Sequence, residues 1–376
     1  MSYARNRLST FIARFLLLAA IVCGLAAPSF ALLPVNPTTF VASPPPAAGP
    51  IGFAYAGNKF VGSILDTFPQ TGVNLLYSTN LIGGNVQLFG GGAPALAASY
   101  GQEHYVAASI GQGGFASGDV YVAAGNNIVH YDNLGNYVGL VVTGSSGPFI
   151  DGDVRGITFD STGSFGGDML VTTHTGHVYT ITSTGTLTQI GFVPLAVPIV
   201  GSPNIGQDTE GLDVVPTTSG WGTLNGALFV ASENSGEIHA ILPTNTPGTP
   251  GFLVTTIASA EQVSYVPTLG GNVLEGMYSA DYKALDVLHA PSANFSGLVG
   301  DIIVTTESAG TIYAIDPTFA STLVGNFPGT VHQPEDGVFV TAGMLVGNPD
   351  APEPTTLAVL ALGSLTLLTT RRRSRA

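Results

Sequence analysis

The chain has 376 residues, of which 45% are hydrophobic and only 9% are charged, and its formal net charge is −14. Seven of its ten basic residues lie near the two ends, so the body between Ala31 and Pro352 keeps 3 basic residues against 23 acidic ones, a net charge of −20. A body this acidic repels nucleic acid and anionic lipid and attracts cations. Its high content of Val, Ile, Leu, Phe and Tyr argues against disorder.

Residues 1–31 have the three parts of a secretory signal peptide. Three arginines precede an apolar stretch at 15–27, and a small-x-small site ends at Ala31, where we expect signal peptidase to cut. An uncleaved N-terminal anchor is the alternative, which the shortness of the apolar run disfavours. Cys23 is the only cysteine and lies inside this segment, so the mature protein has no disulfide and no thiolate metal site.

Residues 32–50 are rich in Pro, Ala, Ser and Thr and predict an extended linker ahead of a folded body at 51–350. In the body, short runs of Val, Ile, Tyr and Thr alternate with turns of Gly, Asn, Asp and Ser every eight to twelve residues. Fifty glycines disfavour helices and suit tight hairpins. The body is therefore predicted to be all-β.

Four similar segments recur along the body. Each is an apolar strand, a tight turn and an alternating strand, and they occupy residues 118–132, 167–181, 226–241 and 300–316. A short strand with a charged lead precedes each one. These leads are Glu103, Arg155, Glu210 and Glu275, with a fifth at Asp336 that no further segment follows.

The leads are 52 to 65 residues apart, which matches one four-stranded blade of a β-propeller with its connections. We expect five blades, or six if residues 80–102 hold another. Strands at 53–55, 59–65 and 73–77 are expected to complete the last blade, because such closure removes free sheet edges. A β-sandwich or a β-helix is the alternative architecture.

The leads of a propeller's first strands gather near its axis. Glu335 and its neighbour Asp336 would meet the other acidic leads there, and hard carboxylate oxygens around a channel suit Ca²⁺. The expected Ca²⁺ ligands are Glu103, Asp153, Glu210, Glu275 and Asp336. The alternative is structural: the acid accepts hydrogen bonds from free backbone amides, and the glycine that follows it supplies a turn.

The last residues form a three-part signal. Pro352-Glu353-Pro354 precedes sixteen uncharged residues at 355–370, and a basic cluster follows at Arg371, Arg372 and Arg373. The apolar run predicts a short membrane helix with its basic end on the cytoplasmic side. In this order, residues 351–376 resemble the PEP-CTERM sorting signal of Gram-negative bacteria. That resemblance implies transient anchoring in the inner membrane, removal of the tail by the protease exosortase, and release of the body to the envelope or extracellular matrix.

A second resemblance concerns one blade. Glu210-Gly211-Leu212, with the strands at 226–230 and 236–238, is similar to blades of gluconolactonase-like and phytase-like propellers. In those families a glutamate at the position of Glu210 helps to hold an active-site calcium, and the resemblance implies the same role here.

Three functions are compatible with these features. The first is a secreted propeller that binds polysaccharide, a surface protein or cations without catalysis, and the second is a calcium-dependent hydrolase of lactones or phosphoesters at the channel mouth. The third is a purely structural matrix component. No complete catalytic motif is present in the sequence, which favours binding over catalysis.

Overall fold

The computed structural model describes residues 34–42, 49–65, 76–90, 103–141, 150, 152–194 and 208–345. The chain divides into two compact units, Met1–Leu33 and Pro34–Ala376, and the first lies outside the described residues. The predicted signal peptide with its cleavage site at Ala31, and the predicted sorting signal with its membrane helix, also lie outside them. None of the helices in the described ranges has the length and apolar character needed to cross a bilayer.

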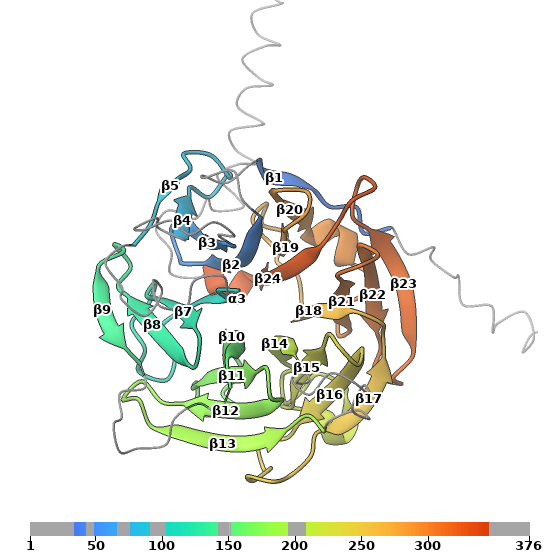
Figure 1. Cartoon of the computed structure of the whole chain (residues 1–376). Helices are drawn as coiled ribbons and strands as arrows, with labels where there is room; N and C mark the ends of the chain where they lie inside the picture. The colour runs from blue at the N-terminus through green and yellow to red at the C-terminus, as the bar shows by residue number, and fades with distance from the viewer. Residues whose placement is uncertain are drawn as a thin grey trace, which may run out of the picture. The chain divides into compact units, whose positions relative to one another are not determined.

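The described part of the second unit is a six-bladed β-propeller, with six four-stranded sheets arranged around one axis (Figure 1). An all-β propeller is therefore confirmed, and the blade count is six. Four blades each use four consecutive antiparallel strands. Blade 1 contains β2 (Pro50–Tyr55), β3 (Phe60–Ile64), β4 (Leu76–Thr79) and β5 (Gln87–Leu88). Blade 2 contains β6 (Val106–Ala108), β7 (Val120–Ala124), β8 (Asn127–Tyr131) and β9 (Tyr137–Leu140).

Blades 3 and 4 follow the same plan. Blade 3 contains β10 (Val154–Phe159), β11 (Met169–Thr173), β12 (His177–Ile181) and β13 (Leu187–Phe192). Blade 4 contains β14 (Thr209–Val214), β15 (Leu228–Ser232), β16 (Glu237–Ile241) and β17 (Phe252–Thr256), with the short 3-10 turn η1 (Gly222–Leu224) before β15.

The last two blades are interlocked. Blade 5 contains β18 (Ala260–Tyr265), β21 (Ile302–Thr306), β22 (Thr311–Ile315) and β23 (Ser321–Asn326). Blade 6 contains β24 (Pro334–Val340), β19 (Gly276–Asp281), β20 (Asp286–Pro291) and β1 (Thr38–Ala42), and η2 (Ser292–Phe295) follows β20. The chain thus leaves blade 5 after its inner strand, makes the two middle strands of blade 6, and returns. A short helix, α3 (Ala342–Leu345), follows β24.

An N-terminal strand does close the last blade, but it is not one of the predicted strands. β1 pairs with β20 as the outer strand of blade 6, whereas residues 50–88 form a blade of their own. Residues 38–42 of the predicted linker form the strand β1, and the assignment of the strands at 53–55 and 59–65 to the last blade was wrong. In the segment at 80–102, Gln87–Leu88 form the outer strand of blade 1, and residues 91–102 lie outside the described residues. Phe40 explains the closure, because its ring meets those of Phe60 and Tyr278 edge-on at 5.2 and 4.9 Å.

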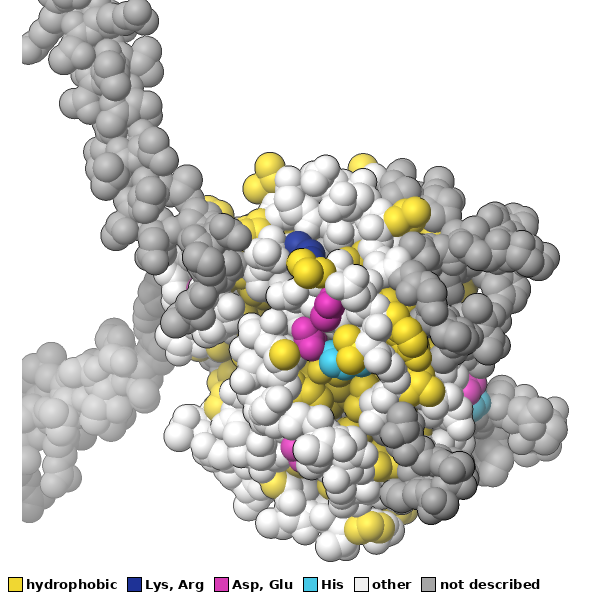
Figure 2. Space-filling view, turned by 90° about the vertical axis from the view of Figure 1, so that its left-hand side faces the viewer, with side chains coloured by type: hydrophobic (Ala, Val, Ile, Leu, Met, Phe, Trp, Pro, Cys, Tyr) yellow, Lys and Arg dark blue, Asp and Glu magenta, His cyan; other side chains and the backbone are white. Residues whose placement is uncertain are grey.

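The core is distributed between the blades. Most buried apolar side chains of the described residues form six clusters, and each cluster joins at least two adjacent blades. Figure 2 views the side of the molecule that carries β5 and β9 and shows few charged side chains there, among them a small group of acidic side chains beside a histidine. Apolar side chains also reach this surface, with Leu88 and Val138 exposed at 57% and 56%.

Hairpin turns between the outer strands use side chains that accept backbone amides, as the Asp- and Asn-rich turns predict. Asp132 accepts the amides of Leu134 at 2.9 Å and Asn136 at 2.8 Å, and Gly135 supplies the left-handed residue with a φ of 89°. Asp316 repeats this arrangement in blade 5, where Phe319 adopts a φ of 70°.

Candidate metal centre at the propeller axis

The six inner strands, β2, β6, β10, β14, β18 and β24, surround the axis, and each contacts the inner strand of the next blade. Five of them have a β-bulge or register shift near the N-terminal end. In β14 the register passes from Thr209 opposite Ser232 to Leu212 opposite Val230, so two residues, 210 and 211, face one. A bulge re-aims the side chains of the residues it adds.

Glutamates occupy the same bulge position in three successive blades. Glu210 of β14, Glu261 of β18 and Glu335 of β24 are each the first residue of the two that the bulge accommodates. Because the bulges lie at one level of the propeller, they direct these carboxylates to one place. The geometry of the inner strands therefore assembles the cluster.

Side chains from the second strands satisfy amides that the bulges release from the sheet. The amide of Gln262 in β18 donates to Thr305 Oγ1 at 3.2 Å, and that of Gly52 in β2 donates to Ser63 Oγ at 2.8 Å. A buried amide left without an acceptor would cost about 1–3 kcal/mol. Hydroxyl residues opposite a bulge thus stabilise it.

The central acidic cluster is Glu210, Glu261 and Glu335, which offer ligand oxygens within 4.8 Å of one another. All three side chains are buried, with only 1–3% of their surface exposed. Neither carboxylate oxygen of Glu261 accepts a hydrogen bond, and one oxygen of Glu335 also has no partner. Burial, and then the negative charge of Glu210, raises the pKa of both Glu261 and Glu335 well above the usual range. The cluster is thus short of positive charge.

A second group shares Glu210 with the first. Asp208, Glu210 and Glu233 also bring ligand oxygens within 4.8 Å of one another, at a less buried level. Burial raises the pKa of Glu233 to about 9. Carboxylates therefore continue from the buried cluster toward more exposed positions.

Tyr105, which directly precedes β6, adds a neutral oxygen to the buried cluster. It is fully buried, and its hydroxyl has no hydrogen-bond partner of normal geometry although it approaches Glu210. Burial, followed by the charges of Glu210, Glu261 and Glu335, raises its pKa well above the usual range. A buried hydroxyl directed at three carboxylates is a further unsatisfied polar group.

Arg155 is the one Lys or Arg among the described residues that lies against the cluster. Its guanidinium contacts the carboxylate of Glu103, and its Nε lies 2.9 Å from Asp208 Oδ1. The same oxygen of Asp208 lies 3.2 Å from Nδ1 of His174. Arg155 therefore neutralises acids at the edge of the cluster. Its positive charge lowers the pKa of Glu210, but burial of that carboxyl has the larger effect and the pKa is raised.

Of the five predicted Ca²⁺ ligands, Glu210 alone belongs to either group. Glu103 pairs with Arg155 instead, and Asp153 gives its backbone carbonyl to the amide of His174 at 2.8 Å. Asp336 lies close enough to feel the charge of Glu210, and burial raises its pKa to about 8. Neither Glu103, Asp153 nor Asp336 contributes a ligand atom to these groups.

The placement of Glu275 on an inner strand was wrong. It precedes β19, the second strand of blade 6, and its Oε2 accepts the amides of Gly270 at 2.8 Å and Gly271 at 2.7 Å. The structural alternative holds for Glu275 in one part only, since the acid accepts free backbone amides but Gly276 lies in the strand β19. The start of the inserted β19–β20 hairpin was mistaken for an inner strand, because Glu275-Gly276 repeats the Glu210-Gly211 pair of β14.

Sequence reasoning missed Glu261 of the central acidic cluster, and Asp208 and Glu233 of the second group. No glycine follows Glu261, so it lacks the Glu-Gly pattern, but it comes 51 residues after Glu210. That spacing is close to the 52 residues between Glu103 and Arg155, whereas Glu275 comes 65 residues after Glu210. Regular spacing of the inner strands was the signal that could have found Glu261.

No protein-family model matches this chain, and no curated protein sequence matches it. Solved structures do resemble it. A streptogramin B lyase structure is 15% identical, with a TM-score of 0.44, over 82% of this chain and 94% of that one. Virginiamycin B lyase from Staphylococcus aureus is 15% identical, with a TM-score of 0.40, over 77% of this chain and 92% of that one.

A third similar structure is a protein of unknown function from Bacteroides thetaiotaomicron VPI-5482. It is 11% identical, with a TM-score of 0.48, over 80% of this chain and 69% of that one. At these identities and scores, the similarities carry no information about activity.

Proposed function

We propose that this protein is an exported β-propeller of the cell envelope or extracellular matrix, which acts by binding, and that Ca²⁺ bound at its axis is part of the folded molecule. The observation that carries the calcium site is the triad of Glu210, Glu261 and Glu335, buried together with unsatisfied oxygens. Several clustered carboxylates repel one another unless protons or a cation compensate them.

The donor set favours Ca²⁺ over transition metals. All the groups are carboxylate or hydroxyl oxygens, and the site has no thiolate, whereas Zn²⁺ prefers nitrogen and sulfur ligands. Ca²⁺ binds oxygens at about 2.3–2.6 Å, so two ligands on opposite sides of one ion are about 5 Å apart. The ligand oxygens of the three carboxylates lie within 4.8 Å of one another, so they fit around a single ion.

The test is thermal unfolding of the purified full-length protein near pH 8, in EDTA and in millimolar Ca²⁺. We expect Ca²⁺ to raise the melting temperature by several degrees, because a bound ligand stabilises only the native state. In Glu261→Gln this shift should disappear, while Asp132→Asn, which removes a carboxylate from an exposed turn of blade 2, should keep it. An unchanged melting temperature in the wild type would refute the calcium site.

Export and partners form the rest of the proposal. The acidic body and the two terminal signals support secretion, processing by signal peptidase and exosortase, and transient anchoring in the inner membrane. The proposed partners are extracellular polysaccharide or a surface protein. The acidity of the body argues against nucleic acid as a partner.

One observation favours a second candidate, a calcium-dependent hydrolase. His174 lies 3.2 Å from Asp208, at the more exposed group that shares Glu210 with the buried cluster. A bound cation would make a water molecule more acidic, and an imidazole beside it can accept a proton. Turnover of lactone or phosphoester probes that requires both Ca²⁺ and His174 would establish catalysis. If the probes stay intact, binding without catalysis remains the proposed function.

A further inference from the structure

A cavity of about 640 Å³ lies at the other end of the inner strands from the acidic cluster. All six inner strands and α3 line it. In β14, Glu210 stands near the start and Asp213 near the end, so the same strand contributes a side chain to both places. The cavity has the size that small-molecule sites typically have.

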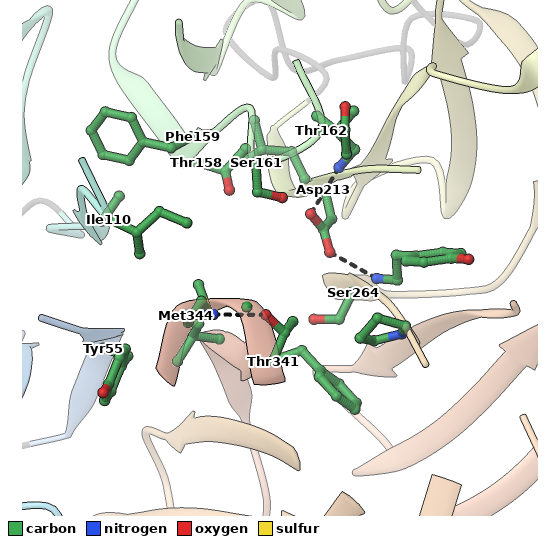
Figure 3. Close-up of a pocket in the computed structure, with 18 of the residues that line it drawn as sticks. Tyr55, Ile110, Thr158, Phe159, Ser161, Thr162, Asp213, Ser264, Thr341 and Met344 are labelled. Atoms are coloured by element: carbon green, nitrogen blue, oxygen red, sulfur yellow. Dashed lines mark hydrogen bonds between the residues drawn. The ribbon is translucent and has the colours of Figure 1, made fainter. Parts of the chain in front are cut away.

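The walls of the cavity differ in chemistry. Figure 3 shows hydroxyl side chains on one side, among them Thr158, Ser161 and Ser264. Ile110 and Met344 supply apolar surface on another side. A ligand with one polar end and one apolar part would match both walls.

Asp213 is the one charged side chain among the described residues that line the cavity. Its Oδ2 accepts the amide of Tyr265 at 2.8 Å, and its Oδ1 accepts the amide of Val214 at 2.8 Å. These bonds hold the carboxylate in one orientation between β14 and β18. Each oxygen keeps a second lone pair for another donor.

We propose that this cavity binds a small organic monocation, with its ammonium group on Asp213 and its apolar part against Ile110 and Met344. Among the described residues that line the cavity there is no Lys, Arg or His, so the charge of Asp213 makes its field repel anions. The hydroxyl groups beside Asp213 can accept the remaining ammonium protons. The strong acidity of the whole body adds long-range attraction for a cation.

The ionisation of Asp213 agrees with this assignment. Burial raises its pKa to about 6, and the two backbone amides only partly oppose that shift. At neutral pH the side chain is therefore mainly ionised, and no basic side chain of the cavity wall balances its charge. A bound ammonium group would supply that balance.

The experiment is isothermal titration calorimetry of the full-length protein at physiological salt with three probes of similar shape. They are 2-phenylethylammonium, neutral 2-phenylethanol and anionic phenylacetate, and glucose tests the neutral saccharide that a hydroxyl wall would also accept. We expect one ammonium to bind per chain, and the neutral and anionic probes to bind at least about tenfold more weakly, a difference of about 1.4 kcal/mol. The result should be the same in EDTA and in Ca²⁺, which separates this cavity from the acidic cluster.

Two variants locate the site. Asp213→Asn removes the charge and Met344→Trp fills the cavity, and each should weaken ammonium binding at least about tenfold. Asp132→Asn, in an exposed turn of blade 2, should leave it unchanged. The proposal is overturned if the ammonium probe does not bind, if the alcohol or glucose binds as tightly, or if Met344→Trp has no effect. Should Asp213→Asn fail to fold, the probe series and Met344→Trp still decide.

Discussion

Gly211 of β14 lies directly against the backbone of Glu261 in β18. A Cβ atom at Gly211 would stand 2.0 Å from the carbonyl oxygen of Glu261, and one at Gly156 of β10 would stand 2.0 Å from that of Glu210. Neither glycine has a positive φ. The sequence suggested that the glycine after the glutamate supplies a turn, but Gly211 does not make one. It lets neighbouring inner strands approach closely enough for their carboxylates to meet.

Gly211→Ala should consequently destabilise the ring of inner strands. The added methyl group has to displace backbone, and such overpacking costs about 1–3 kcal/mol. Urea unfolding of the variant measures the loss. Gly84→Ala is the matched control, because its nearest neighbour would be the side chain of Asn80 at 3.5 Å. Equal effects of the two substitutions would contradict the close approach.

Stability without divalent cations should fall as the pH rises from about 5 to about 8. The pKa of Asp336 is raised to about 8, and those of Glu261 and Glu335 are raised well above the usual range. Between the unfolded and folded pKa values, the native state binds more protons than the unfolded state. The free energy of unfolding then decreases by about 1.4 kcal/mol per pH unit for each such proton. Denaturation in EDTA across this range measures the slope.

Glu261→Gln provides the sharpest check of that explanation. The neutral amide removes one titrating group and its repulsion from Glu210, so the variant should be more stable than the wild type near pH 8 in EDTA. Added Ca²⁺ should reverse this order, since only the wild type keeps the full ligand set. A wild-type stability that is flat in EDTA would show that the acids are compensated in some other way.

His332 and Asp281 hold the closing blade. His332 Nδ1 lies 2.7 Å from Asp281 Oδ2, and the side chains are only 7% and 0% exposed. Replacing His332 with Ala should cost about 1.5–3 kcal/mol, the value of a buried hydrogen bond to a charged group. His130, also 2.7 Å from its partner Asp119 but with 22% of its side chain exposed, is the control. His130→Ala should cost less than about 1 kcal/mol in the same denaturation experiment.

Processing at the C-terminal signal can be read from the mass of the secreted protein. We expect mature material to begin after Ala31 and to lack the residues beyond about Pro354, because in the proposed export route the apolar run and Arg371–Arg373 are a sorting signal that is removed. Replacing Pro352-Glu353-Pro354 with alanines should leave the tail attached and the protein in the membrane fraction. Secreted wild-type protein with an intact arginine cluster would contradict this route.

Much of the fold was predictable because it depends on local patterns. Strand-turn-strand segments such as 118–132 and 226–241 recur, and hairpin turns such as that at Asp132 depend on a few adjacent residues. Glu210 could likewise be placed near the axis, since it opens the inner strand of a regular blade. Its position near the axis follows from the repeat.

The partners of Glu210 were less accessible to sequence reasoning. The β19–β20 hairpin belongs to blade 6, although the strands before and after it in the chain belong to blade 5. Because of this arrangement, Glu261 lies on an inner strand near the axis and Glu275 does not. Strand pairing over such separations depends on packing between blades, which a local pattern of glycine and acid does not report.

The sequence alone determined an all-β repeating body, its acidity and its few basic residues, because composition and short-range periodicity carry those properties. Only the tertiary structure decided which strands share a blade, which strand closes the ring, and which three glutamates meet. Those outcomes depend on bulges at one level of the inner strands and on glycines that let the strands touch. Contacts of that kind form between residues far apart in the chain.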